Sequence, residues 1–146
     1  MEYAILLILH VFLAIIIIGG LFIARFIVIP HARKTENSDF AFTYFEAFNK
    51  GAHAVLFIQF LIGFRLGMTY LPIGDWFTFS SSMSLTLVLK LCFWVLLFAW
   101  LIIGKRMGYI NPEKKDLSKA SRYYGILTFL GLALMILGLN VRLVLF

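Results

Sequence analysis

The sequence predicts an all-α integral membrane protein, a four-helix up-down bundle, and three observations support this fold class. Of the 146 residues, 62% are hydrophobic, whereas soluble domains average about 45–50% apolar residues. The apolar residues fall into four runs, and each reaches the roughly 20 residues that a helix needs to cross the hydrocarbon core. Polar connections separate these runs, which is typical of a bundle whose successive helices alternate in direction.

The apolar runs place the four spans at residues 3–29, 51–71, 83–103 and 123–146 of a single transmembrane domain. The first run is longer than the roughly 7–15 apolar residues of a signal peptide, so we expect a retained span. Residues 85–89 taken alone could form a strand. Because their apolar run continues to residue 103 and open strand edges are unstable in lipid, a helix is favoured.

The charges of the connections predict the orientation. The first and third connections carry nine Lys and Arg residues between them, and the second, residues 72–82, carries none. Because basic residues collect in cytoplasmic loops, we expect both termini to lie outside, and we expect the bacterial inner membrane. The net charge of +6 comes mainly from these loops. The expected partner is therefore the lipid bilayer, and no nucleic acid is expected.

Two local patterns predict finer structure. Residues 38–48 carry five aromatic residues and begin with Ser38 and Asp39, either of which could cap a helix. We expect this segment to be helical and to extend the second span inward. Within that span, Gly63 and Gly67 have the small-xxx-small spacing that lets helices approach closely.

Ionisable residues inside the spans are the main clue to function, because lipid makes an unpartnered charge or imidazole costly. Counted at about 1.5 Å per residue, His10, Arg65 and Lys90 all lie in the outer halves of their spans. Asn140 and Arg142 end the fourth span on the same side, and no Asp or Glu lies at this level. These cations predict a bound anion. Snorkelling of Arg65 and Arg142 to the interface is the alternative.

Haem would provide a partner both for the imidazole and for the cations. Its iron accepts an imidazole such as His10, and its propionates pair with cations such as Lys90 and Arg65. His53 is the second candidate ligand. It lies roughly 10–15 Å from the level of His10 by the boundaries above, and closer if the second helix begins near Phe40. The alternative for His53 is an interfacial histidine bonded to backbone.

Three stretches carry a family pattern: residues 9–11 (Leu-His-Val), residues 19–25 (Gly-Gly-Leu-Phe-Ile-Ala-Arg) and residues 89–91 (Leu-Lys-Leu). They resemble the HemJ-type protoporphyrinogen oxidases and the related CopD-type membrane domains. The resemblance implies four helices, haem b and oxidation of protoporphyrinogen in the membrane. The conserved His, Arg and Lys of that family match His10, Arg25 and Lys90.

The first functional hypothesis is a haem-b membrane redox protein of HemJ type, which oxidises a porphyrinogen or passes electrons to a membrane acceptor. Because the chain has no nucleotide-binding motif, a quinone or a membrane redox partner would accept the electrons. Whether the chain is an enzyme stays open. Arg25, nearer the inner surface, could serve a second anionic site or snorkel. The candidate site residues are His10 and His53 as metal ligands, with Arg25, Arg65, Lys90 and Asn140 at the cofactor.

Two alternatives remain. A CopD-like copper-handling protein would use thioethers such as Met68 and Met83 above His10, because Cu(I) prefers soft ligands, although nearby cations repel copper. A non-catalytic transporter or assembly subunit could bind an organic anion without metal. A homodimer is possible for any of these, since a small apolar bundle often pairs.

Overall fold

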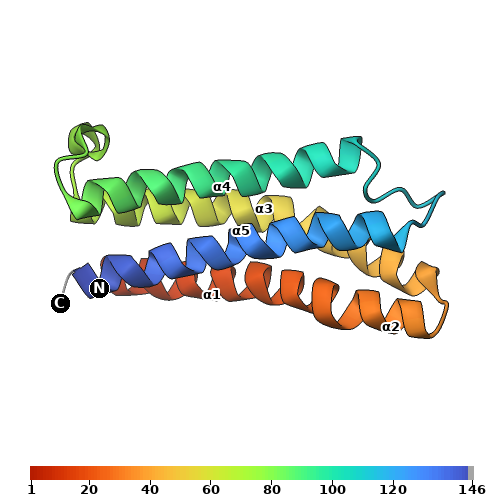
Figure 1. The fold of residues 1–146 in the computed structure, drawn as a ribbon. Helices are drawn as coiled ribbons and strands as arrows, with labels where there is room; N and C mark the ends of the chain where they lie inside the picture. The colour runs from red at the N-terminus through yellow and green to blue at the C-terminus, as the bar shows by residue number, and fades with distance from the viewer. Residues whose placement is uncertain (145–146) are drawn as a thin grey trace.

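The computed structural model describes residues 1–144, and it describes side chains as far as Val141. Four long helices run antiparallel, and the described chain contains no strand (Figure 1). The prediction of an all-α four-helix bundle is therefore confirmed. The elements are α1 (Glu2–Ile23), η1 (Ala24–Val28), α2 (Ile29–Lys34), α3 (Ser38–Tyr70), η2 (Ile73–Thr78), α4 (Ser82–Arg106) and α5 (Leu117–Val144).

Each long helix has two neighbours in the bundle. Helix α1 packs against α3 and α5, and α4 packs against α5 and α3. The start of α1, the described end of α5 and η2 lie at one end, which we call the outer end. The α2–α3 and α4–α5 connections lie at the other end, the inner end (Figure 1). All four helices are long and apolar enough to cross a membrane, with α1, η1 and α2 acting as one continuous helix.

All four helices continue past the predicted spans at the inner end. The first helix reaches Lys34 and α4 reaches Arg106, while α3 begins at Ser38 and α5 at Leu117. The expected helical extension of the second span by residues 38–48 is correct. Hydropathy underestimates these ends because polar residues continue a helix once it leaves the lipid. Residues 145–146 of the predicted fourth span lie outside the described residues.

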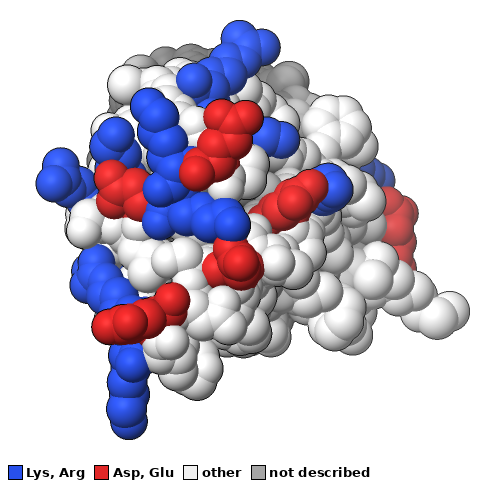
Figure 2. All heavy atoms as spheres, turned by 90° about the vertical axis from the view of Figure 1, so that its right-hand side faces the viewer, with Lys and Arg blue, Asp and Glu red and all other residues white. Residues whose placement is uncertain are grey.

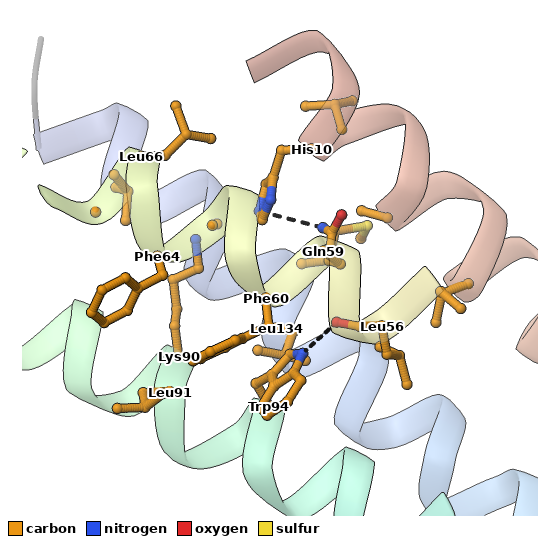
Figure 3. A pocket seen from close by; sticks show the side chains of 18 of the residues that line it. His10, Leu56, Gln59, Phe60, Phe64, Leu66, Lys90, Leu91, Trp94 and Leu134 are labelled. Atoms are coloured by element: carbon orange, nitrogen blue, oxygen red, sulfur yellow. Dashed lines mark hydrogen bonds between the residues drawn. The ribbon is translucent and has the colours of Figure 1, made fainter. Parts of the chain in front are cut away.

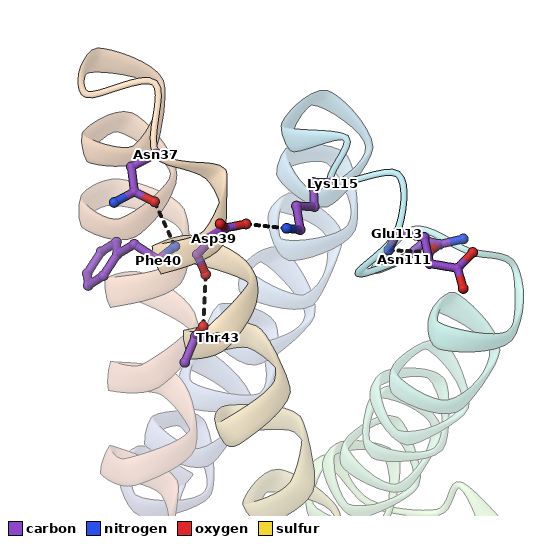
Figure 4. Close-up of polar contacts among 7 residues, drawn as sticks. All are labelled: Asn37, Asp39, Phe40, Thr43, Asn111, Glu113 and Lys115. Atoms are coloured by element: carbon purple, nitrogen blue, oxygen red, sulfur yellow. Dashed lines mark hydrogen bonds and ion pairs between the residues drawn. The ribbon is translucent and has the colours of Figure 1, made fainter.

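The start of α3 is capped one residue earlier than predicted. The Asn37 side chain accepts a hydrogen bond of 3.2 Å from the backbone N–H of Phe40, so Asn37 is the N-cap rather than Ser38 or Asp39 (Figure 4). The Asp39 carboxylate instead forms an ion pair with Lys115 of the α4–α5 connection. This pair joins the two connections of the inner end.

Charge collects at the inner end, where Figure 2 shows Lys and Arg side chains interspersed with acidic ones. The two inner connections, residues 30–50 and 104–122, hold nine Lys and Arg against five Asp and Glu. Lys50 pairs with Glu46 at 2.9 Å one helical turn away. The inner connections thus carry more basic than acidic residues, and the predicted orientation depends on this excess.

A π-helical turn, η1, interrupts the first helix just before Pro30. The backbone N–H of Ile29 donates to Ala24 O, five residues back instead of four. Proline has no N–H, and its ring would clash with the carbonyl four residues earlier in an α-helix. The wider turn relieves this clash while the helix continues in α2, where Pro30 takes a first-turn position.

The inner half of the bundle is tightly packed around two adjacent tyrosines of α5. Tyr123 and Tyr124 are fully buried, and the Tyr124 ring lies 4.6 Å from that of Phe45 between centroids. The Tyr123 hydroxyl donates to Leu101 O at 3.1 Å, and the Tyr124 hydroxyl donates to Asn49 Oδ1 at 3.4 Å. Free internal space is therefore found in the outer half.

Candidate functional site

A cavity of about 620 Å³ lies between the four long helices in the outer half of the bundle. Its volume falls within the roughly 300–1,000 Å³ of small-molecule and cofactor sites. Aliphatic and aromatic side chains form most of its wall. The strongly polar groups in the wall are His10 from α1, Gln59 from α3 and Lys90 from α4 (Figure 3).

The His10 ring fits against α3 at Gly63. A Cβ added to Gly63 would lie 2.8 Å from His10 Cε1 and 3.4 Å from Nδ1, too close for the ring to stay in place. Gly67, one turn further, makes room in the same way for the indole of Trp76 from η2. The two glycines were predicted to permit close helix approach. In the structure they hold an imidazole and an indole against the α3 backbone.

Gln59, one turn before Gly63, is the only polar side chain bonded to the His10 ring within the described part of the chain. Its Nε2 lies 3.4 Å from His10 Nε2, which gives the amide the donor role and the ring nitrogen the acceptor role. Gln59 is only 9% exposed. Its Oε1 and the His10 Nδ1 are both buried without a hydrogen-bond partner, so this wall has unmet hydrogen-bonding capacity.

Lys90 extends from α4 into the interior on the side facing His10 (Figure 3). Its Nζ lies 4.0 Å from where a Cβ on Gly138 of α5 would stand. Among residues 1–141, no hydrogen bond or ion pair engages this ammonium. An unpaired cation in an apolar cavity is unfavourable and attracts an anionic group.

Aromatic rings form the α3 and α4 side of the cavity. The rings of Phe60 and Trp94 are 4.5 Å apart between centroids and tilted by 32°, and Phe64 lies 5.1 Å from Trp76. The Trp94 indole N–H donates to Leu56 O at 3.3 Å, which fixes its plane. Such a wall suits a flat, apolar ligand.

Of the predicted site residues, His10 and Lys90 come together in the cavity, and the other four lie elsewhere. Arg65 turns to the outer end of the bundle, where its Nη2 forms a 2.9 Å ion pair with Glu2. Asn140 is exposed and does not line the cavity. The side chain of Arg142 lies outside the described residues. The predicted cation cluster is thus reduced to Lys90 among the described side chains.

His53 and Arg25 are held in the inner half. His53 Nδ1 lies 2.6 Å from Asn49 O of its own helix, and its ring packs edge-on against Phe98. It does not line the cavity with His10, although α3 begins as early as Ser38. Arg25 donates from Nη1 to Ser121 Oγ of α5, so it is bonded inside the bundle instead of snorkelling.

Gln59 is the site residue that the sequence analysis missed. It is an uncharged polar residue near the middle of an apolar span, and such residues often bond across membrane helices. The sequence prediction considered only charged and imidazole side chains, and it therefore did not include Gln59. No group of three or more His, Cys, Asp or Glu side chains capable of holding a metal ion occurs among the described residues.

No protein-family model, curated protein or solved structure matches this chain.

Proposed function

We propose that this protein binds haem b within the membrane and acts in redox chemistry, in the manner of the HemJ-type proteins that its first span resembles. The observation that carries the proposal is the meeting, in one apolar cavity, of an imidazole and an ammonium from different helices, the ammonium having no partner among residues 1–141. Haem combines an iron that accepts imidazole nitrogen with carboxylates that accept an ammonium.

The chemistry of the cavity wall fits this cofactor. His10 would bind the iron through Nδ1, which is buried without a hydrogen-bond partner among the described residues; the ring proton would then be on Nε2. Lys90 would hold a propionate. Phe60 and Trp94 would pack on the porphyrin face. His10 is the imidazole in the cavity wall, so the arrangement supports one protein ligand to the iron rather than the His10 and His53 pair.

The role of the protein is to hold and orient the group that carries the chemistry. Haem supplies a one-electron iron couple when bound. With Nδ1 on the iron, Nε2–H would donate to the Gln59 amide, turned so that its oxygen faces the ring. Gln59 would then fix the orientation of the ring, as second partners of metal-binding histidines generally do. The apolar wall excludes water. A porphyrinogen substrate and a quinone or membrane redox partner as electron acceptor belong to this proposal, as does action as an oxidoreductase.

The test is haem binding by the purified protein in detergent. We expect an absorption band near the Soret position that sharpens on reduction with dithionite, and we expect His10→Ala to lose it. His53→Ala is the matched control, because it removes an imidazole outside the cavity. A wild-type protein that neither contains haem nor binds added haemin would refute the proposal.

The same cavity supports a second candidate, a non-catalytic binder of an organic anion. The unpaired Lys90 ammonium favours an anion whether or not a metal accompanies it. A colourless protein that binds a fatty-acid carboxylate and loses it in Lys90→Met would support this candidate. A CopD-like copper site would instead appear as copper in metal analysis.

A further inference from the structure

Among its described lining residues, the cavity has one exposed edge. Four of its lining side chains are exposed on the bundle surface: Val11 by 48%, Ile15 by 63%, Met135 by 44% and Leu139 by 57%. The remaining lining residues are buried or half-buried. Two of the four lie one helical turn apart on α1, and the other two lie one turn apart on α5. A residue that both lines a cavity and lies on the surface stands at the mouth of that cavity.

The seam between α1 and α5 supports this geometry. Below the mouth the two helices touch, because a Cβ on Gly131 would lie 3.4 Å from Leu21 and 3.7 Å from Ile18. Because α1 and α5 are antiparallel, residue numbers decrease toward the outer end on α1 and increase toward it on α5. Ile15 therefore stands opposite Met135, and Val11 stands opposite Leu139, on the two sides of the opening.

Contacts between α1 and α3 close the outer end of the bundle. Glu2 pairs with Arg65 at 2.9 Å, and the hydroxyls of Tyr3 and Tyr70 lie 2.5 Å apart. Trp76 of η2 is buried against Gly67 beneath them. The four mouth residues, in contrast, are wholly apolar and lie along transmembrane helices, so the surface they occupy faces lipid.

We propose that the seam between α1 and α5 is a lateral entrance through which a membrane-dissolved amphiphile with a carboxylate enters the cavity. The ammonium of Lys90 stands just inside, 4.0 Å from the Cβ position of Gly138, which neighbours Leu139 of the mouth. An apolar opening admits the hydrophobic body, and the cation behind it selects the negatively charged end. The entrance deepens the proposed function by assigning the ligand a route from the bilayer, and it applies equally to a ligand that is not haem.

The test locks the mouth and measures entry. The starting variant carries Cys92→Ala, Trp94→Phe and Trp100→Phe, which leaves Trp76 as the reporter. Trp76 is 3% exposed and lines the cavity, so a quencher that enters the cavity comes into contact with it, whereas one that stays in the bilayer does not. Ile15→Cys and Met135→Cys are then added and joined with a bis-methanethiosulfonate cross-linker, whose bonds dithiothreitol cleaves.

The probe is a dibrominated stearic acid added to phosphatidylcholine vesicles that contain the protein. We expect Trp76 fluorescence to be quenched several-fold more slowly in the cross-linked protein, and cleavage of the link to restore the rate. Val11→Cys with Leu139→Cys should behave alike if the first pair folds poorly. Glu2→Cys with Arg65→Cys, which ties α1 to α3 at the outer end, is the control and should not slow quenching.

Equal rates in the linked and cleaved proteins would overturn the entrance, as would the absence of quenching in both. Haem binding by the wild-type protein is measured separately by its absorption. If cross-linking slows quenching but the wild-type protein binds no haem, the entrance is supported and the haem proposal is refuted. If the protein binds haem but cross-linking does not change the quenching rate, the haem proposal is supported and the entrance is refuted.

Discussion

The imidazole of His10 in α1 occupies the space that a side chain at Gly63 of α3 would fill. The imidazole lies where even a methyl group on Gly63 would come within 2.8 Å of Cε1. The position of the candidate ligand is therefore set by a residue without a side chain on a neighbouring helix. This dependence makes the ring movable by a substitution that does not touch the histidine itself.

Gly63→Ala should displace the His10 ring and weaken haemin binding by about tenfold, or about 1.4 kcal/mol. Gly51→Ala on the same helix is the control, because a Cβ there meets nothing within 4 Å. Haemin titration followed by absorption measures both variants. Unchanged affinity in Gly63→Ala would contradict the assignment of His10 as the iron ligand.

Lys90→Met should have opposite effects on stability and on binding. Removal of an unpaired ammonium from an apolar cavity should raise the melting temperature of the ligand-free protein, by about 2–4 °C if the gain is 1 kcal/mol. Loss of the charged partner should weaken haemin binding by about 1.5–3 kcal/mol. Thermal unfolding in detergent and haemin titration give the two quantities. Lys114→Met, an exposed lysine of the inner end, should change neither.

The predicted orientation can be tested by labelling cysteines with a membrane-impermeant maleimide. In a Cys92→Ala background, Gly74→Cys in η2 should react in intact cells. Lys114→Cys should react only after the membrane is permeabilised, because the basic inner end is expected in the cytoplasm. The opposite pattern would place both termini inside.

Asp116 predicts a pH dependence at the start of α5. Its Oδ1 accepts hydrogen bonds from the backbone N–H groups of Ser118 at 2.9 Å and Lys119 at 3.1 Å. The bond from Lys119 is the largest cause that lowers the pKa of this carboxyl below its ordinary value of 3.8. A lowered pKa in the folded protein means that the carboxylate stabilises the fold above that ordinary value. This stabilisation is lost as the pH falls through the lower, folded-state pKa.

Asp116→Ala should therefore lower the melting temperature by a constant amount from neutral pH down to about pH 5, and the difference should shrink at more acid pH. Melting curves of both proteins across this range provide the measurement. Glu113→Ala in the same connection is the control, since its carboxylate caps no helix within the described residues. A difference that grows as the pH falls would contradict the capping role.

Hydropathy was enough to predict the fold class and the level of the site, because both depend on how far each residue lies along its helix. It placed His10 and Lys90 correctly at one depth. Depth does not give the direction in which a side chain points around the helix. Gly138 and Val141 line the cavity, whereas Asn140, between them in sequence, faces outward. That angle is fixed by contacts between helices, which a single apolar run does not encode.

The pairing of Arg65 shows the same limit. Its depth suggested a propionate partner, but Glu2 lies within reach at the outer end and takes the guanidinium. The N-cap of α3 was missed by one residue for a more local reason. Asn37, Ser38 and Asp39 are all good caps, and Asp39 is engaged by Lys115, a residue of the distant α4–α5 connection.

The wide turn at Ala24–Val28 sets the angular registration of the first helix. It contains one residue more than an α-helical turn would, and each residue of an α-helix advances the chain by about 100°. If the same residues formed a regular α-helix instead, the part of the helix before the turn would be rotated relative to α2 by about that angle. The His10 imidazole would then leave its position against Gly63. The wide turn next to Pro30 lies more than about twenty ångströms from His10 along the helix, at 1.5 Å per residue. It nevertheless determines the direction in which the His10 side chain points.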